Sequence, residues 1–485
     1  MSELFAHQRE AVSFLVKRRA AMLTLEMGLG KTRCALKAAE ALYVAGSIDR
    51  MLVLAPAAVR FSWRQEIDKL DAESFLPCVY DPKKAQVYGA GKREGRPLPV
   101  LIVSYALLPQ KKHVEALQRW CSTGKTALVA DESSFLKNRA AKQTRGAKLL
   151  SRASRYCWLL TGTPIANSPL DLYAQADVMC DGVREGPLRG MSNWWQFRAR
   201  YGVLQTMHIG RKSFQHVVGY QNLPELTKRF APYVLRREKK DCLDLPDKTY
   251  EVREVALTEA TWHIYQELKR EAMLALPDTD ATPEPNAAVR LLRLAQITSG
   301  HVGHPEMDAG TQEPSGGVRD VSSEKLSWLV DQILDGELSN ERALIVWCRW
   351  RRERKRLAER LTTIAVTQIY GGQSQKERDA NITEFQTESP RRVVMLAQPH
   401  AGGFGLNLTR AGTAVYLSND FSYSTRIQSE DRCHRISQTR NVLYLDVLAT
   451  GPNGEKTIDH HIVDALCAKK NVATLTCNEW KKALA

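Results

Sequence analysis

A glycine-rich segment followed by lysine and threonine carries the clearest chemistry in the sequence. It reads Gly28-Leu29-Gly30-Lys31-Thr32. An apolar run at 20–25 precedes it and a helix-like stretch at 33–39 follows, so the segment would join a strand to a helix N-terminus. Glycines let the backbone approach a polyphosphate, whose charge then meets backbone N–H groups and the helix dipole.

In such a loop the lysine reaches the β- and γ-phosphates and the threonine hydroxyl binds Mg²⁺. Lys31 and Thr32 are therefore predicted to hold a nucleoside triphosphate and its metal. Leu25 stands where the full phosphate-loop pattern has its first glycine, so the match is partial. The alternative is a glycine turn that happens to precede a lysine.

Two adjacent carboxylates, Asp131 and Glu132, follow a second apolar run at 127–130. Ligands of α/β sheets bind at the carboxyl ends of parallel strands, so both carboxylates would face the same crevice as the phosphate loop. Asp131 would hold Mg²⁺, directly or through water, and Glu132 would polarise the attacking water. An isolated Asp-Glu pair is usually solvated surface, so this prediction depends on the strand before it.

Arg432 and Arg435 have a spacing that, on a helix, places both guanidinium groups on one face. Such a pair can meet the γ-phosphate from an opposite lobe and stabilise charge in the transition state. The alternative is a solvent-facing pair, which the flanking residues Gln428, Asp431 and Gln438 make the weaker interpretation.

Two α/β units are expected to position these residues. Short apolar runs with the length of buried parallel strands recur within 1–235, with helix-like segments between them; they lie at 51–55, 100–103, 127–130 and 157–160. Residues 320–485 repeat the pattern at 343–347, 392–396, 414–417 and 442–445, and are expected to end in a helix. Helices should cover both faces of each sheet.

The segment between these units, 236–319, has a different pattern. Helical periodicity at 259–274 and 287–297 is interrupted by a Pro/Asp/Glu break, and a Gly/Pro/polar loop follows from 300 to 317. We expect a helical insertion with a flexible loop. His301 and His304 lie in that loop without cysteine partners, which favours a plain loop over a metal site.

The composition fits a protein of the cytoplasm. The chain has 485 residues and is 44% hydrophobic, which is enough for two or three cores. No apolar run approaches the ~20 residues that span a bilayer, and no signal peptide is visible. The ten cysteines are scattered without a C-x-x-C pair, which argues against structural zinc and disulfides and indicates a reducing compartment.

The net charge of +15 favours a polyanionic partner, although the excess could simply keep the chain soluble. Charge alone does not separate DNA, RNA and anionic membrane, but no amphipathic anchor supports a membrane. The basic run 349–356 is either a solvated helix face or a phosphate-contacting surface, with Trp350, Leu357 and Leu361 on its buried side. The pair Trp194-Trp195 favours helix packing over a base-stacking platform.

Taken in order, these and further motifs resemble the Swi/Snf-type branch of the superfamily-two helicase-like ATPases. The matching segments are 4–8, 26–32, 55–66, 104–105, 131–138, 160–164, 235–248, 370–372, 402–408 and 428–438. The resemblance covers about residues 4 to 470 and implies two tandem RecA-like P-loop lobes, 1–235 and 320–485, with the helical insertion 236–319 between them.

The resemblance also implies roles for single residues. Gln8 would read the adenine, the loop from Gly28 to Thr32 would hold the phosphates, and Gly405 would complete the nucleotide site. Trp63 belongs to a motif that touches the nucleic-acid backbone in this branch. Ser134 stands where the branch usually has a histidine that links nucleotide state to lobe movement, so the strength of that coupling is open.

The implied function is ATP-dependent translocation on duplex DNA without sequence specificity, with ATP and Mg²⁺ as cofactors. We expect a monomer in the cytoplasm of a bacterium, associated with the nucleoid, or in the host cytoplasm if a phage encodes it. One alternative is a strand-separating helicase, which would need a wedge or pin. The other is a remodeller that branch-migrates or anneals DNA.

Overall fold

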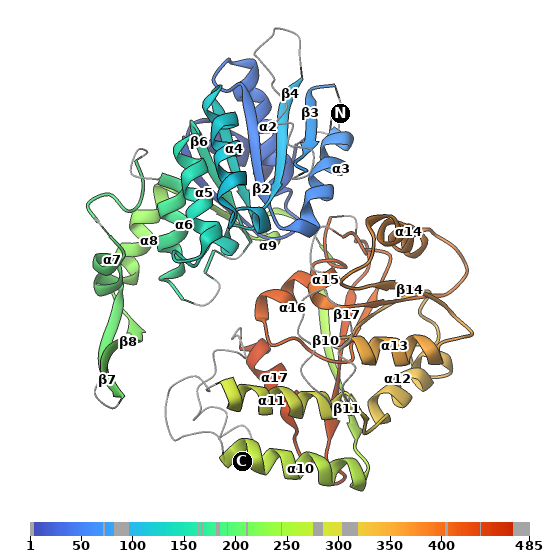
Figure 1. Ribbon diagram of the computed structural model, residues 1–485. Helices are drawn as coiled ribbons and strands as arrows, with labels where there is room; N and C mark the ends of the chain where they lie inside the picture. The colour runs from blue at the N-terminus through green and yellow to red at the C-terminus, as the bar shows by residue number, and fades with distance from the viewer. Residues whose placement is uncertain are drawn as a thin grey trace. The chain divides into compact units, whose positions relative to one another are not determined.

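Figure 1 shows the computed structural model of the chain. It describes residues 4–70, 73–81, 97–162, 164–165, 168–180, 185–191, 193–209, 212–243, 245–274, 285–302, 319–402, 406–436 and 438–468. The chain divides into two compact units, Met1–Asp244 and Leu245–Ala485.

The first unit is built on a seven-stranded parallel sheet with the order β3-β4-β2-β5-β6-β1-β9. Its strands are β1 (Ala20–Leu25), β2 (Arg50–Ala55), β3 (Phe75–Val79), β4 (Leu98–Ser104), β5 (Thr126–Asp131), β6 (Tyr156–Leu160) and β9 (Val234–Arg237). The central strands are continuous apolar runs because a parallel sheet is covered on both faces. Both Leu52 and its neighbour Val53 are fully buried, although they point to opposite faces.

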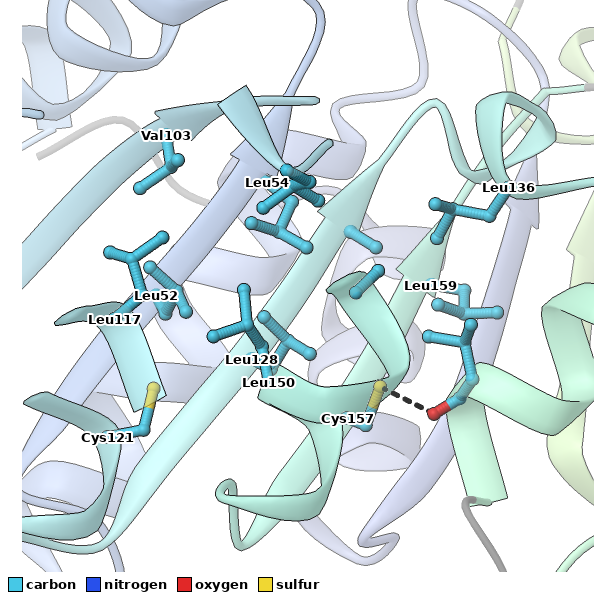
Figure 2. Close-up of a cluster of buried hydrophobic side chains, with 14 of the residues drawn as sticks. Leu52, Leu54, Val103, Leu117, Cys121, Leu128, Leu136, Leu150, Cys157 and Leu159 are labelled. Carbon is cyan, nitrogen blue, oxygen red and sulfur yellow. Dashed lines mark hydrogen bonds between the residues drawn. The ribbon is translucent and has the colours of Figure 1, made fainter. Parts of the chain in front are cut away.

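Figure 2 shows the core on one face of this sheet. Leu52 and Leu54 of β2 lie beside Leu128 of β5 and Leu159 of β6, and the facing helices contribute Leu117 and others. Those helices are α4 (Lys111–Ser122), α5 (Lys142–Arg152) and α6 (Asp171–Cys180). Each fully buried leucine contributes roughly 1.5–3 kcal/mol, so this cluster fixes the strands whose ends carry the candidate site.

The second unit contains a six-stranded parallel sheet with the order β10-β17-β16-β13-β15-β14. Its strands are β10 (Lys248–Ala256), β13 (Ala343–Trp347), β14 (Ala365–Ile369), β15 (Val393–Ala397), β16 (Thr413–Tyr416) and β17 (Val442–Thr450). Its helices include α12 (Glu324–Leu334), α13 (Arg351–Arg360), α14 (Gln375–Gln386), α15 (Pro399–Gly402), α16 (Tyr423–Glu430) and α17 (Ile458–Cys467).

Alternate residues of β13 belong to two separate cores. Leu344 and Val346 pack with Leu329 of α12, whereas Ile345 and Trp347 pack with Phe385 of α14. Helices therefore cover both faces of this sheet, as the apolar runs predicted. The expected α/β fold class, with two parallel sheets, is confirmed.

The residues of the expected middle segment, 236–319, contribute to both units. Strand β9 ends at Arg237 in the first sheet, while β10 lies at the edge of the second sheet, paired with β17. The two expected helices are present as α10 (Glu259–Leu274) and α11 (Pro285–Thr298). Tyr265 of α10 accepts a hydrogen bond from the Ile458 backbone N–H at 2.8 Å, so these helices pack on α17. Most of the Gly/Pro loop, including His304, lies outside the described residues.

A small hairpin module in the first unit was not expected. Strands β7 (Gly202–Ile209) and β8 (Lys212–Tyr220) form a separate antiparallel pair between α7 (Trp194–Tyr201) and α8 (Leu223–Phe230). Phe197 and Phe230 are buried in a cluster of their own with residues of α6. The hairpin stands apart from the seven-stranded sheet (Figure 1).

Among the helices of the described ranges, none has the length and apolar character that crossing a bilayer requires.

Candidate nucleotide site

The predicted nucleotide-binding residues of the first unit lie at the ends of three adjacent strands. These strands are adjacent in the order β5-β6-β1. Strand β1 leads into the phosphate loop, β5 ends at Asp131, and β6 lies between them. All three run parallel, so their carboxyl ends share one edge of the sheet. The loop 26–30, the segment after Leu160 and the Asp131-Glu132 pair therefore meet there, where ligands of α/β sheets bind.

The phosphate loop depends on two glycines in the left-handed region. Gly28 has φ 88° and Gly30 has φ 81°, which L side chains rarely adopt. A β-carbon at Gly30 would also lie only 2.5 Å from Nε2 of Gln8. Helix α2 (Lys31–Val44) begins directly after Gly30, so its N-terminal N–H groups point toward the loop.

Lys31 is folded over its own loop. Its Nζ donates to the Leu25 carbonyl at 2.9 Å, and the side chain is largely buried. A β-carbon at Gly162, in the segment after β6, would lie 3.7 Å from Nζ and 3.2 Å from Met27 Cγ. The ammonium group thus lies between the ends of β1 and β6. Its hydrogen bonds go to backbone carbonyl oxygens, and phosphate oxygens are acceptors of the same kind.

Gln8 lies beside the phosphate loop. Its Nε2 donates to the Leu29 carbonyl at 3.3 Å, and its Oε1 accepts from the Phe5 N–H at 3.2 Å. His7 also contacts the Leu29 carbonyl, with Nε2 at 3.1 Å. The N-terminus of α1 (Ala6–Val16) is thereby attached to the loop, a position from which Gln8 can contact a nucleotide base.

Asp131 is buried at the end of β5 and both of its carboxylate oxygens accept hydrogen bonds. Oδ2 accepts from Trp63 Nε1 at 2.8 Å and Oδ1 from the Glu132 N–H at 3.0 Å. Burial raises the pKa of Asp131, while the bond from Trp63 and the charge of Lys31 act to lower it. Tyr105 donates to the Asp131 backbone carbonyl at 2.7 Å, which fixes the strand end.

The position of Trp63 differs from what its motif implied. Its side chain, on α3 (Arg60–Leu70), is fully buried and orients the carboxylate of Asp131 rather than facing a nucleic-acid backbone. This contact could not be predicted from the sequence, because the two residues are 68 positions apart.

Glu132 has an unusual backbone conformation, with φ 47° and ψ 55°. Among the described residues it is one of two non-glycine positions with positive φ, and its side chain is 7% exposed. Holding a residue there costs about 1–3 kcal/mol, and such strain clusters at functional sites. The conformation turns the chain sharply after β5, so Glu132 and Asp131 leave the strand in different directions.

A buried bridge connects the Asp-Glu segment to the segment after β6. Ser133 Oγ donates to Gln175 Oε1 at 2.8 Å, and Gln175 Nε2 donates to the Pro164 carbonyl at 2.7 Å. Gln175, on α6, is fully buried. Sequence analysis missed it, although a glutamine on the apolar helix 171–180 is a signal that a buried amide has specific partners.

Thr32 and Asp131 are the residues that fit Mg²⁺. Hydroxyl and carboxylate oxygens are its preferred protein ligands, and Mg²⁺ usually binds through one or two carboxylates together with phosphates and water. Within the described residues there is no group of three or more His, Cys, Asp or Glu side chains that could hold a metal ion. His301 is buried against Trp350, and burial lowers the pKa of its imidazole to about 4.

In the second unit, the expectation that Arg432 and Arg435 lie on a helix is wrong. Helix α16 ends at Glu430, and both arginines follow it in a series of turns. They nevertheless converge, because Arg435 Nη1 donates to the Leu406 carbonyl at 2.7 Å and Arg432 Nη1 to the same oxygen at 3.5 Å. Arg432 is 4% exposed, whereas Arg435 is only partly buried. Gly405, which precedes Leu406, lies outside the described residues.

Glu430 anchors the turn that carries these arginines. It accepts from Arg426 Nε at 2.8 Å, from Tyr250 OH at 2.8 Å and from Lys248 Nζ at 3.1 Å. Arg426 also forms a two-pronged ion pair with Asp446 of β17. Strand β10 is therefore attached to α16 by side chains as well as by its pairing with β17.

The basic run 349–356 is largely engaged within the second unit. Arg352 pairs with Asp320, and Arg356 donates to the carbonyls of Gly300 and Ser322 at 3.1 and 2.9 Å. Arg354 is buried and hydrogen-bonded to Gln368. The buried face expected from Trp350, Leu357 and Leu361 is confirmed, since all three are at most 6% exposed. These arginines hold the protein together and are poor candidates for a phosphate-contacting surface.

Comparison with known proteins gives two family matches. A model described as "SNF2-related domain" matches residues 7–304, and one described as "Helicase conserved C-terminal domain" matches residues 324–437. An uncharacterized ATP-dependent helicase of Mycoplasma genitalium is 24% identical over 490 residues, covering 99% of this chain and 43% of that protein. The DNA annealing helicase and endonuclease ZRANB3 of Bos taurus is 24% identical, covering 100% of this chain and 41% of that protein.

Among solved structures, the Sulfolobus solfataricus SWI2/SNF2 ATPase core in complex with dsDNA has a TM-score of 0.42 and 21% identity, with coverage of 100% of this chain and 95% of that one. The chain spans less than half the length of the two curated relatives named above.

Proposed function

Because the chain belongs to the SNF2-related family, we propose that it is an ATP-dependent translocase on double-stranded DNA. The membership confirms the resemblance to Swi/Snf-type helicase-like ATPases, and with it the reading of the two α/β units as RecA-like lobes. One observation supports the proposed activity best. The phosphate loop, the Asp131-Glu132 pair and the segment after β6 lie at the same edge of the first sheet.

In the proposed site ATP binds at this edge of the first lobe. Gly28, Leu29 and Gly30 offer backbone N–H groups to the phosphates, and Lys31 exchanges its carbonyl partners for phosphate oxygens. Gln8 contacts the adenine from beside the loop, and Gly405 of the second lobe completes the nucleotide site. The supporting geometry is that Gln8, the glycine loop and Lys31 lie together at one edge of the sheet.

Hydrolysis is assigned to the carboxylates. Glu132 orients and deprotonates the attacking water, while Thr32 and Asp131 hold Mg²⁺, which supplies positive charge to the phosphate oxygens when it is bound. Trp63 and the Glu132 N–H keep the Asp131 carboxylate in one orientation. Preorganisation of this kind lowers the cost of reaching the transition state.

Arg432 and Arg435 are proposed to stabilise charge on the γ-phosphate from the second lobe. Their convergence on the Leu406 carbonyl supports a joint role, and Arg435 is the more accessible of the two. Closure of the lobes on ATP would then be required for hydrolysis, which links the chemistry to movement along DNA.

DNA is proposed as a partner without sequence preference. The net charge of +15 supports binding through phosphates, which carry no sequence information. Such binding should weaken steeply with salt, because each neutralised phosphate of a duplex adds about −0.9 to the log–log slope.

The second candidate is annealing or strand-separating activity. It is supported by the relative described as a DNA annealing helicase, and by the β7–β8 hairpin, which supplies the kind of element that a pin would need. ATPase assays with blunt duplex, single-stranded, forked and RNA ligands separate the two. We expect the largest stimulation from blunt duplex; stimulation by forked or single-stranded ligands alone would favour the second candidate.

A further inference from the structure

The two tryptophans at the start of α7 have different environments. Trp194 packs edge-on against Tyr173, with ring centroids 5.3 Å apart, and stacks on Phe197. Trp195 instead has 62% of its surface exposed, more than the other large aromatic side chains of the described residues. The packing role expected for this pair therefore applies to Trp194 and leaves Trp195 unexplained.

Two arginines flank the exposed indole. The guanidinium carbon of Arg139 lies 5.6 Å from the Trp195 ring centroid, and that of Arg198 lies 5.9 Å from it. Arg139 also lies 5.4 Å from the Trp194 ring, and Arg198 donates to the Gln215 carbonyl of β8. Residues from two different segments, the loop after Asp131-Glu132 and helix α7, thus place two positive charges over the ring of one exposed tryptophan.

This combination fits an unstacked nucleobase with its phosphate. An exposed indole face stacks on any base, and adjacent guanidinium groups meet the phosphate and can stack on a neighbouring base. A base inside a blunt duplex is already stacked on both faces, so only an unpaired strand can use the indole. The positive net charge of the chain favours this occupant over a basic or neutral peptide.

We propose that Trp195, with Arg139 and Arg198, is a binding site for an unpaired nucleotide of single-stranded nucleic acid. It would let the protein distinguish forks, gaps and displaced strands from intact duplex.

The test is binding without ATP, so it does not depend on the proposed ATPase activity. Labelled polythymidine and a labelled blunt duplex are titrated with full-length protein while fluorescence anisotropy is measured. Trp195→Ala should weaken polythymidine binding by about five- to 150-fold, the equivalent of ~1–3 kcal/mol of stacking per base, and should leave duplex binding unchanged. Trp195→Phe should retain most of the affinity, because a phenyl ring also stacks.

Arg139→Ala and Arg200→Ala form a matched pair. Both remove one positive charge, but Arg200 is engaged in an ion pair with Glu225 at 2.8 Å. Only Arg139→Ala should weaken polythymidine binding. The proposal is overturned if Trp195→Ala leaves polythymidine binding intact, if it weakens both ligands equally, or if the two arginine variants behave alike. If no DNA ligand responds to Trp195→Ala, an acidic protein segment becomes the occupant to examine.

Discussion

Glu132 is the residue on which the proposed chemistry depends most. Its strained backbone is maintained by the buried end of β5, and its N–H is bonded to the Asp131 carboxylate. We expect Glu132→Gln to bind ATP normally but to lower kcat by at least ~10²-fold, the usual loss on removing a general base. Steady-state ATPase with duplex DNA, together with nucleotide binding by titration, measures both quantities. Turnover close to that of the unchanged protein would remove Glu132 from this role.

The two arginines of the second lobe should behave differently. Arg435→Ala is expected to lower DNA-stimulated kcat by ~10³-fold or more, the scale of an arginine finger, while DNA affinity is retained. Arg432→Ala should lower kcat as well, but it should also destabilise the protein, because Arg432 is buried and donates to the carbonyls of Gln428 and Leu406. If Arg435→Ala lost DNA affinity and kept its turnover, Arg435 would be a phosphate contact instead.

At the scale of single residues, the sequence predicts those sites whose residues lie close together in the chain. The spacing of Gly28, Gly30 and Lys31 encodes the loop directly, and the structure places them as expected. Trp63 and Gln175 could not be assigned, because their partners Asp131 and Ser133 are 68 and 42 residues away. Only the strand order of the folded sheet brings these pairs together.

Among the elements, α6 is expected to link the Asp-Glu segment to the segment after β6. Gln175→Leu keeps the side-chain volume but removes both hydrogen bonds, leaving Ser133 and the Pro164 carbonyl unsatisfied. We expect ATP binding to persist and stimulation by DNA to fall, since the two segments then respond to nucleotide separately. Basal and DNA-stimulated ATPase rates measure the effect.

Ser133→Ala combined with Gln175→Leu is the control for that experiment. Replacing both partners of a hydrogen bond by apolar groups is nearly neutral for stability, whereas removing one costs ~1–3 kcal/mol. The double variant restores this balance for the Ser133–Gln175 bond, while the Pro164 carbonyl still lacks the Gln175 donor. If the double variant regains stability and still responds poorly to DNA, the bridge acts in coupling. If DNA stimulation recovers together with stability, Gln175 only supports the fold.

Helix α13 of the second unit should make stability depend on pH through Glu353. Burial raises the pKa of this carboxyl to about 7, against the nearby charge of Lys325 and a bond from Ser418 that lower it. The folded state then binds more protons than the unfolded state between pH 4.5 and about 7, so stability falls as pH rises through that window.

Glu353→Gln should remove the loss of folding stability that accompanies ionisation of Glu353 as the pH rises. Urea unfolding should show the variant to be more stable than the unchanged protein at about pH 8, by at most about 3 kcal/mol, with the advantage gone at about pH 4.5. If the variant is no more stable than the unchanged protein at about pH 8, ionisation of Glu353 does not destabilise the fold. The charge of Lys325 would then compensate that of the buried carboxylate.

Element types were predictable, but their pairing was not. Apolar runs of strand length identified the central strands, and helical periodicity identified α10 and α11. Strand β10 lies at a sheet edge and has mostly exposed or partly buried residues, so its sequence lacks the apolar run that marked the central strands. The β7–β8 hairpin was missed as well, although Gly210-Arg211 between two alternating runs is a recognisable turn signal.

At the scale of the whole molecule, the proposed translocase uses ATP to move along duplex DNA without separating its strands. The most direct test compares displacement of a triplex third strand with unwinding of a tailed duplex, using Glu132→Gln as the inactive control. We expect ATP-dependent displacement of the third strand, no displacement by Glu132→Gln, and no unwinding of the tailed duplex. Efficient unwinding of the tailed duplex without activity on the triplex would contradict it.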